Sequence, residues 1–339
     1  MIRRREFITL LGGAAAAWPL AARAQQTKIA KLGFVSWQSP TRIDDLRQGL
    51  RDLGYVEGKN IEIEVHFVDG DRERTQNAIR TLIQKGVDIL VVRATPAAHI
   101  AKAMSRTIPI VMQVSDPLAT GLVESLSHPG GNLTGVANSG PDLAGKRLEI
   151  LREIRPGIRT VAFLGSSKDP NGATFARETQ GAADQIGLNV LVRLVDSADA
   201  LDESDFHAMQ RHGVEAVIVQ PIFTGYRVKI VGLARNSQLP VISDYIPFAE
   251  AGALLTLGVD DAERVRRVAY YVDRILKATR PAELPVEQPT TFQLVLNVLT
   301  AKSFGWTIPP MLPSSGRPIC WSPTRRASEQ KRHRSRCSG

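Results

Sequence analysis

The sequence has 339 residues, of which 43% are hydrophobic and 23% charged, and its formal net charge is +9. The positive charge lies at the two ends, because residues 1–24 carry a net +3, residues 311–339 carry +6, and the 286 residues between them are neutral. A neutral central part without a basic stripe gives no reason to infer a nucleic-acid partner, and its lack of cysteine excludes thiol nucleophiles, redox pairs and thiolate metal sites there.

The first 24 residues have the pattern of an export signal. Arginines at 3–5 precede an apolar stretch at 7–20, which is shorter than the ~20 residues needed to span a bilayer. Ala22 and Ala24 form a small-x-small cleavage site, and the run RRREFI resembles a twin-arginine signal. We therefore expect export to the periplasm and cleavage after Ala24. The alternatives are the general secretory route and an uncleaved membrane anchor.

Strand-like and helical patterns alternate through the first half of the chain. Apolar runs that favour strands occur at 29–36, 61–67, 87–92, 108–112 and 132–137. Helical periodicity falls between them, at 41–53, 72–85 and 96–106. Strands that alternate with helices of 10–15 residues predict right-handed βαβ units and a parallel sheet.

The same alternation begins again after a helix expected at 141–154. Further strands are expected at 159–165, 188–195, 214–220, 240–243, 253–257 and 291–297. The helices expected with them are at 171–186, 202–212, 226–237, 260–278 and 298–304. We expect two α/β lobes, the first made of 29–137 and about 250–279, and the second of 140–249 and about 284–310. A ligand site should lie where the carboxyl ends of both sheets face each other.

Residues 311–339 differ from the rest of the chain. They are rich in Ser, Arg and Pro, have no apolar period, and contain Cys320 and Cys337. Such a composition predicts a disordered tail. The alternatives are a basic interaction arm and the product of a shifted reading frame.

Motifs that suggest catalysis are incomplete. The stretch GPDLAGKR at 140–147 has the spacing of a phosphate loop, but Arg147 stands where Ser or Thr would hold magnesium. The six histidines are scattered, and His207 and His212 are five residues apart, which does not place them on one helical face as a metal pair requires. Asp260 and Asp261 are interpreted as an N-cap and a first-turn charge of the helix that follows. We therefore expect neither a metal nor a cofactor.

Small polar residues follow several expected strands and are the candidate ligand contacts. They are Ser36, Trp37, Thr95, Pro96, Ala97, Ser115, Asp116, Asn138, Ser166, Asn171, Gln220, Asp244 and Tyr245. Helix N-termini at these loops suit a carboxylate. Asp116 or Asp244 can pair with an ammonium, and Trp37 or Tyr245 can stack on an apolar group. The alternative interpretation is that they are ordinary caps and turns.

Six longer stretches together resemble bacterial ABC-transporter substrate-binding proteins of the group with tryptophan- and tyrosine-binding members. They are LRQGL (46–50), LGYVEGKNIEIE (53–64), TPAAHIAKAMSRTIPIVM (95–112), SDPLATGLVESLSHPGGNLTGV (115–136), KRLEIL (146–151) and LPVEQPTTFQLVLNVLTAKSFG (284–305). The resemblance implies a type I periplasmic-binding fold, with two Rossmann-like α/β lobes of parallel strands joined by a hinge of three strands. It places 95–97 and 115–117 in the cleft.

Two positions depart from that resemblance. Arg93 stands where relatives have small residues, which implies an altered pocket edge. After GWTIPP at 305–310 the relatives continue with a short apolar, acidic ending, and this chain continues with the Ser/Arg tail.

The main hypothesis is a non-enzymatic, monomeric periplasmic receptor for a small organic solute, such as an amino acid. The lobes would close on the solute and deliver it to an ABC permease in the inner membrane. A ligand carboxylate would meet the N–H groups before the helix that starts at Pro96, and Asn171, Gln220 and Asp244 would contribute from the second lobe. The alternatives are an α/β enzyme with Asp116 or Asp244 as its base, and a ligand-sensing module of a regulator or receptor.

Overall fold

Aliphatic runs in the first half of the chain form a five-stranded parallel sheet. The computed structural model describes residues 29–37, 43–138, 143–288, 292–310, 312 and, as backbone, 319–321. The sheet order is β2-β1-β3-β4-β5. Its strands are β1 (Ala30–Ser36), β2 (Ile61–Phe67), β3 (Ile89–Arg93), β4 (Ile110–Val114) and β5 (Leu133–Ala137). The central strands read ILVVR and IVMQV and are buried along most of their length, as expected when helices cover both faces.

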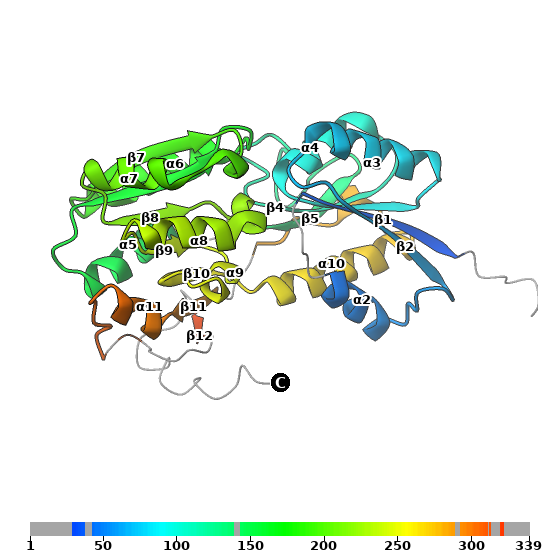
Figure 1. The fold of residues 1–339 in the computed structure, drawn as a ribbon. Helices are drawn as coiled ribbons and strands as arrows, with labels where there is room; N and C mark the ends of the chain where they lie inside the picture. Colours follow the sequence, from blue (N-terminus) through cyan, green and yellow to red (C-terminus); the bar gives the residue numbers. More distant parts are fainter. Residues whose placement is uncertain are drawn as a thin grey trace, which may run out of the picture.

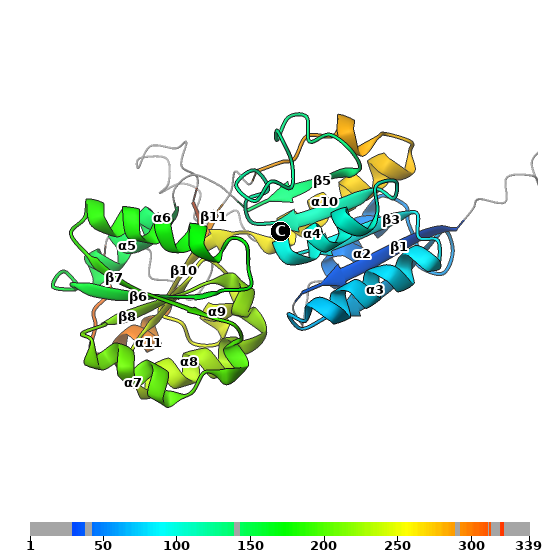
Figure 2. The same cartoon turned by 90° about the horizontal axis from the view of Figure 1, so that it is seen from above.

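Four helices cover this sheet (Figures 1 and 2). On one face lie α3 (Arg72–Gln84) and α4 (Thr95–Met104), whose apolar residues share a core cluster with the strands. On the other face lie α2 (Ile43–Asp52) and α10 (Asp261–Leu276). The helices α2 and α10 approach closely at Gly49, where an added Cβ would lie 2.9 Å from the Cβ of Ala269. The sequence therefore uses glycine where two helices of the first lobe touch.

The second half forms a seven-stranded sheet of order β12-β11-β10-β9-β8-β6-β7. Strands β6 to β10 are parallel, and β11 and β12 run antiparallel at one edge. The strands are β6 (Thr160–Ser166), β7 (Asn189–Val195), β8 (Ala216–Val219), β9 (Val241–Ser243), β10 (Leu255–Val259), β11 (Phe292–Leu296) and β12 (Ile319–Trp321).

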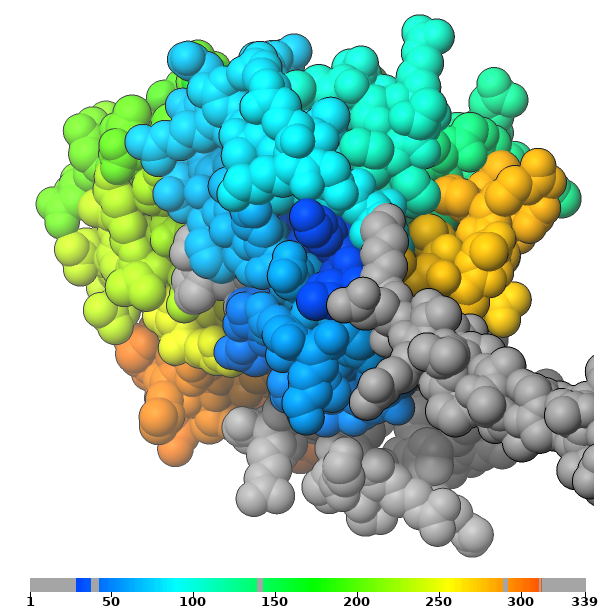
Figure 3. Space-filling model, turned by 90° about the vertical axis from the view of Figure 1, so that its right-hand side faces the viewer, coloured from blue at the N-terminus to red at the C-terminus, as the bar shows by residue number. Residues whose placement is uncertain are grey.

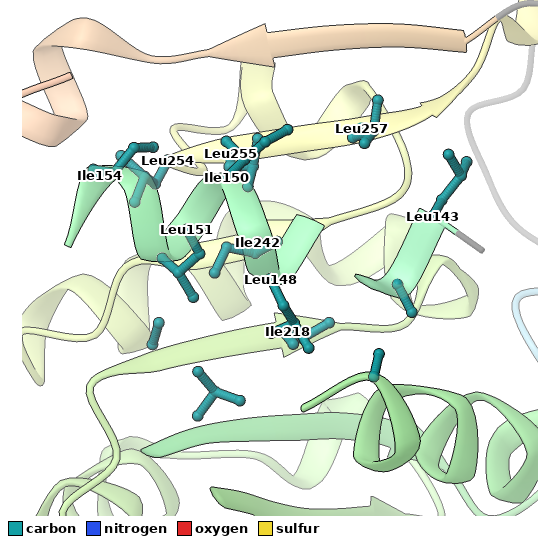
Figure 4. Packing of buried hydrophobic residues seen from close by; sticks show 14 of the residues in the cluster. Leu143, Leu148, Ile150, Leu151, Ile154, Ile218, Ile242, Leu254, Leu255 and Leu257 are labelled. Carbon is teal, nitrogen blue, oxygen red and sulfur yellow. The ribbon is translucent and has the colours of Figure 1, made fainter. Parts of the chain in front are cut away.

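Helices also cover both faces of the second sheet. On one face lie α5 (Leu143–Ile154), α6 (Gly172–Gln185) and α11 (Val298–Ser303), where α5 packs its leucines against β10 (Figure 4). On the other lie α7 (Glu203–Arg211), α8 (Arg227–Asn236) and α9 (Pro247–Glu250). Three 3₁₀ helices complete the lobes: η1 (Ala198–Ala200), η2 (Pro221–Tyr226) and η3 (Pro281–Glu283). Each lobe is thus a sheet between two helical layers.

Two expected lobe boundaries need correction. The segment 250–279 was expected in the first lobe, but β10 pairs with β9 and β11 in the second sheet, and only α10 packs on the first lobe. The segment 284–310 was expected in the second lobe, and β11 and α11 lie there, but its first residues join the first lobe, where Glu287 pairs with Val136 beside β5. In Figure 3, the gold residues of α10 and beyond lie beside the blue and cyan first lobe. The pairing of the strands therefore decides which lobe each segment joins, and the spacing of the strands along the sequence does not reveal that pairing.

The expected disordered tail contributes one described strand. Residues Ile319–Trp321 form β12 antiparallel to β11, where the edge of the sheet offers backbone groups for pairing. The export signal expected at 1–24 lies outside the described residues. Within the described part of the chain, no helix is both long and apolar enough to cross a bilayer.

Candidate functional site

The carboxyl ends of the first lobe's strands meet the loops of the second lobe in a cleft. A hydrogen bond crosses it, because Asn171 Nδ2 at the start of α6 donates to Thr95 Oγ1 at the start of α4 over 2.7 Å. Both side chains are buried. The contact fixes the first helical turns of the two lobes against each other at the carboxyl edge of both sheets.

The cleft contains three connected spaces. We call the middle one, of 80 Å³, the central cleft; it is lined from both lobes, including Arg93, Thr95, Asp169 and Tyr245. A space of 440 Å³ extends from it between α5 and α6, and we call this the α5–α6 arm. A third space, of 430 Å³, opens beside Trp37 and Asp169. The first two volumes together fall within the range of small-molecule sites.

Ten of the thirteen predicted contact residues line these spaces. Those at the central cleft are Ser36, Trp37, Thr95, Ser115, Asn138 and Tyr245. Those at the arm include Asp116, Asn171 and Asp244, and Ser166 lines the third space. Most of the predicted residues therefore lie together, because the residues that follow parallel strands meet at one edge of each sheet.

The structure corrects the expected positions of Pro96, Ala97 and Gln220, which do not line these spaces. Pro96 and Ala97 form the first turn of α4 and are buried, with Ala97 in the core cluster under that helix. Gln220 is a supporting residue: its Oε1 accepts from Ser166 N over 2.8 Å and its Nε2 donates to Asp169 Oδ2 over 2.7 Å. A residue can thus follow a strand and still face the core or its neighbours rather than the cleft.

A buried charge network that the sequence did not predict lies at the base of the cleft. Asp261 pairs with Arg93 Nη2 at 3.1 Å and with Arg264, and it accepts from Gln113 Nε2 over 2.9 Å and from Tyr245 Oη over 2.5 Å. Burial alone would raise the pKa of Asp261, but the two guanidinium groups outweigh it and hold the pKa well below its usual value. Burial, together with the Asp261 carboxylate, raises the pKa of Tyr245 to about 12.

Asp260 and Asp261 are adjacent but have different roles. Asp260 caps α10, because its Oδ1 accepts from Ala262 N at 2.9 Å and from Glu263 N at 3.2 Å. Asp261 lies in the first turn of α10, as expected, and its side chain in addition belongs to the cleft network, which was not expected. The only signal in the sequence was Arg93, a charged residue ending an otherwise apolar strand.

The turn from β3 into α4 has a strained backbone. Ala94 has φ 81° and ψ 145°, a region that residues with a Cβ rarely adopt. Among the described side chains, none caps the start of α4. Strained residues of this kind cluster at ligand sites. The conformation aims the start of α4 at the central cleft, which Ala94 itself lines.

Asp169 is a second buried carboxylate that sequence patterns missed. It accepts from Asn171 N over 3.0 Å and from Gln220 Nε2 over 2.7 Å, in the loop between β6 and α6. Burial outweighs these hydrogen bonds and raises the pKa of Asp169 from 3.8 to about 6. The carboxyl therefore titrates close to neutral pH at the border of the central cleft and the third space.

The raised pKa of Asp169 predicts a measurable pH dependence of stability. The folded state binds this proton more tightly than the unfolded chain, so stability is highest below the unfolded pKa of 3.8 and falls as pH rises to about 6. We expect Asp169→Asn to remove a decline on the order of 2–3 kcal/mol in the free energy of unfolding between about pH 4 and 7. Urea unfolding across that range measures it. If the free energies of unfolding of wild type and Asp169→Asn change with pH in parallel, the prediction is contradicted.

Three buried polar atoms at the cleft have no hydrogen-bond partner among the described residues. They are Asp244 Oδ1, Asn171 Oδ1 and Arg264 Nε. Burial raises the pKa of Asp244, and the charges of Arg147 and Arg264 oppose this only in part. All three residues line the α5–α6 arm near its junction with the central cleft. Because buried polar atoms are nearly always satisfied, these atoms fit a ligand with both donors and an acceptor.

Asp116, the other predicted carboxylate, has a local structural role. Its Oδ1 accepts from the backbone N–H groups of Leu118 and Ala119, each over 2.9 Å. This pattern closes the turn that follows β4. In the described part of the chain, no group of three or more His, Cys, Asp or Glu side chains is arranged to hold a metal ion.

Comparisons with known proteins agree with this architecture. The family model described as ABC transporter substrate binding protein matches residues 28–315. A tyrosine-binding protein of Clostridioides difficile is 22% identical over 286 residues, which cover 83% of this chain and 82% of the relative.

Solved structures are also similar. A conserved domain protein from Vibrio cholerae has a TM-score of 0.78 at 26% identity, covering 84% of this chain and 97% of that one. The ABC domain of Streptococcus pneumoniae in complex with L-Trp has a TM-score of 0.76 at 28% identity, covering 83% and 96%. A leucine-binding protein from Thermotoga maritima, at 11% identity, has a TM-score of 0.57 over 79% of this chain and 95% of that one, a likeness of fold alone.

Proposed function

Because the chain belongs to the family of ABC transporter substrate-binding proteins, we propose that it binds a free α-amino acid between its lobes and delivers it to a membrane permease. Its two lobes have the type I periplasmic-binding fold. Two similar proteins carry amino acids, tyrosine in one case and L-Trp in the other. These relatives are binding proteins rather than enzymes.

The three unpartnered atoms of the cleft carry the proposal. An α-ammonium group supplies donors for Asp244 Oδ1 and Asn171 Oδ1, and an α-carboxylate supplies an acceptor for Arg264 Nε. Arg147 and Arg264 lie on the same wall as Asp244, so both signs of charge are present where a zwitterion would sit. A ligand that lacks either charged group would leave at least one buried atom unsatisfied.

Binding is coupled to closure of the lobes. Asn171 and Tyr245 of the second lobe donate to Thr95 and Asp261, which belong to the first lobe and its helix α10. These bonds cross the cleft, so rotation of one lobe away from the other separates them. A ligand that contacts both lobes stabilises the closed form by its difference in affinity for the two states. The permease then distinguishes loaded from empty receptor by this closure.

The remaining parts of the proposal concern location and chemistry. We propose that the signal expected at 1–24 exports the receptor to the periplasm, and that it acts there as a monomer without a nucleic-acid partner. The enzyme alternative at Asp116 conflicts with the turn that this carboxylate closes. We therefore propose binding without turnover at Asp244, and release of an unchanged ligand.

The test is a thermal unfolding series with the twenty standard amino acids. A ligand that binds only the folded state at 100 times its Kd adds about 2.7 kcal/mol of stability and raises the Tm. We expect such a concentration-dependent rise for at least one zwitterionic amino acid, and none for its methyl ester or its N-acetyl derivative. Mass spectrometry should recover the ligand unchanged. Equal shifts with the blocked derivatives, or conversion of the ligand, would overturn the proposal.

A further inference from the structure

The α5–α6 arm leaves the cleft and extends along the side of the second lobe. Its polar end holds Asn171, Asp244 and Arg264, and it continues between α5 and α6. Its apolar lining consists of Leu143, Ala144, Phe175, Ala182 and Val259. The arm is therefore polar where it joins the central cleft, and beyond that point it has an apolar side next to a polar edge formed by Glu178 and Gln185, which suits an amphipathic molecule.

The arm is longer than the side chain of a standard amino acid. Its α6 wall includes Thr174, Glu178, Gly181 and Gln185, which recur at helical spacing on one face. Eleven residues of helix rise about 16 Å along the axis. Toward its outer end this face is exposed to solvent at Glu178, Gly181 and Gln185, and a Cβ on Gly181 would meet no atom within 4 Å. The outer half of the arm is therefore open to solvent along one side.

We infer that the ligand is an elongated amphiphile, with a free amino group at its head and an apolar chain longer than any standard side chain. The inference rests on the proposed function, because it places the amino group at Asp244 and Asn171 as above. The apolar chain then lies between α5 and α6 against Phe175 and Val259. Long-chain α-amino acids have this chemistry and keep the α-carboxylate that the proposed function places at Arg264, whereas a dipeptide has a peptide bond at that point.

Isothermal titration of the full chain tests this inference. The probes are L-2-aminodecanoic acid, L-leucine, L-tryptophan, L-leucyl-L-leucine and glycylglycine. We expect L-2-aminodecanoic acid to bind at least about tenfold more tightly than leucine and tryptophan, because added buried methylenes contribute ~0.8 kcal/mol each. L-Leucyl-L-leucine should bind more weakly than L-2-aminodecanoic acid, because its first carboxyl is part of the peptide bond. Glycylglycine, which has a dipeptide backbone without apolar chains, should bind weakly.

The variant Gly181→Leu tests where the apolar chain of the ligand lies. It fills the outer arm with a side chain and replaces a helical glycine by a better helix former, so the fold should be kept. Gly232→Leu on α8 is the matched control, since a Cβ there also meets nothing within 4 Å and it lines none of the three spaces. We expect L-2-aminodecanoic acid to bind about 10–100-fold more weakly to Gly181→Leu, and with unchanged affinity to Gly232→Leu.

Two results would overturn the inference. Tighter binding of leucine or tryptophan than of L-2-aminodecanoic acid, unaffected by Gly181→Leu, would leave the proposed function standing and refute the elongated ligand. Failure of every amino-bearing probe to bind wild type would refute the inference together with the proposed function.

Discussion

Replacing Asp261 by Asn is expected to lower the free energy of unfolding by about 3–5 kcal/mol, the largest stability effect of any single substitution in the cleft. The side chain of Asp261 is only 3% exposed, and it is the carboxylate shared by Arg93 and Arg264, which are themselves 13% and 8% exposed. Asparagine has the same shape but no charge. The substitution therefore leaves Arg93 without its counter-charge and removes the carboxylate that Arg264 contacts, and this desolvation cost destabilises the fold.

The control for this substitution is its neighbour. Asp260→Asn makes the same chemical change one residue earlier, but asparagine caps a helix about as well as aspartate, so the loss should be only a few tenths of a kcal/mol. The double variant Asp261→Asn with Arg93→Met should recover part of the loss, since one unpaired charge is removed. Urea unfolding at pH 7 measures all four proteins. If Asp261→Asn lowers the free energy of unfolding by less than about 1 kcal/mol, the charge network at the base of the cleft does not stabilise the fold.

The pH dependence of this loss has a definite sign. The pKa of Asp261 in the folded state lies below its unfolded value of 3.8. The stability that its charge provides is therefore fully present above about pH 4 and is lost as pH falls further toward the folded pKa. The difference between wild type and Asp261→Asn should thus stay constant from pH 5 to pH 8 and shrink only in stronger acid.

The contrast between Asp260 and Asp261 shows how far the sequence reaches. Periodicity locates α10 and its start because burial of an apolar stripe is a local, repeating demand along the chain. It does not say which of two adjacent carboxylates caps the helix and which faces Arg93, 168 residues away along the chain. That choice depends on how α10 packs against α2, a long-range contact that leaves no mark near residue 261.

The same reasoning explains the lobe boundaries and the site. Strand β10 was expected near 253–257 and lies at Leu255–Val259, but the sheet that it joins is set by pairing with β9 and β11. Residues that follow strands, such as Thr95 and Asp244, reach the cleft because parallel strands end at one edge. Asp169 lies within a loop and Arg264 within a helix. Neither directly follows a strand, so their position in the sequence does not identify them as cleft residues.

Asp244→Asn is expected to weaken amino-acid binding on the order of 10²–10³-fold while leaving the fold intact. The proposed ammonium partner of Asp244 Oδ1 is buried with it, and removal of one member of a buried, hydrogen-bonded charge pair costs about 2–5 kcal/mol of affinity. Folding should not suffer, because burial already raises the pKa of this carboxyl and so makes its charge unfavourable in the empty protein. We expect the free energy of unfolding without ligand to stay equal or rise.

Asp116→Asn separates this effect from a general loss of negative charge at the cleft. Asp116 also lines the α5–α6 arm, but its Oδ1 accepts from two backbone N–H groups, a role that asparagine can fill. Titration of the preferred amino acid into both variants should therefore show a large loss for Asp244→Asn and less than about a threefold change for Asp116→Asn. Equal losses would place the ammonium between the two carboxylates. A loss confined to Asp116→Asn would move it to the β4 turn and contradict the assignment of Asp244.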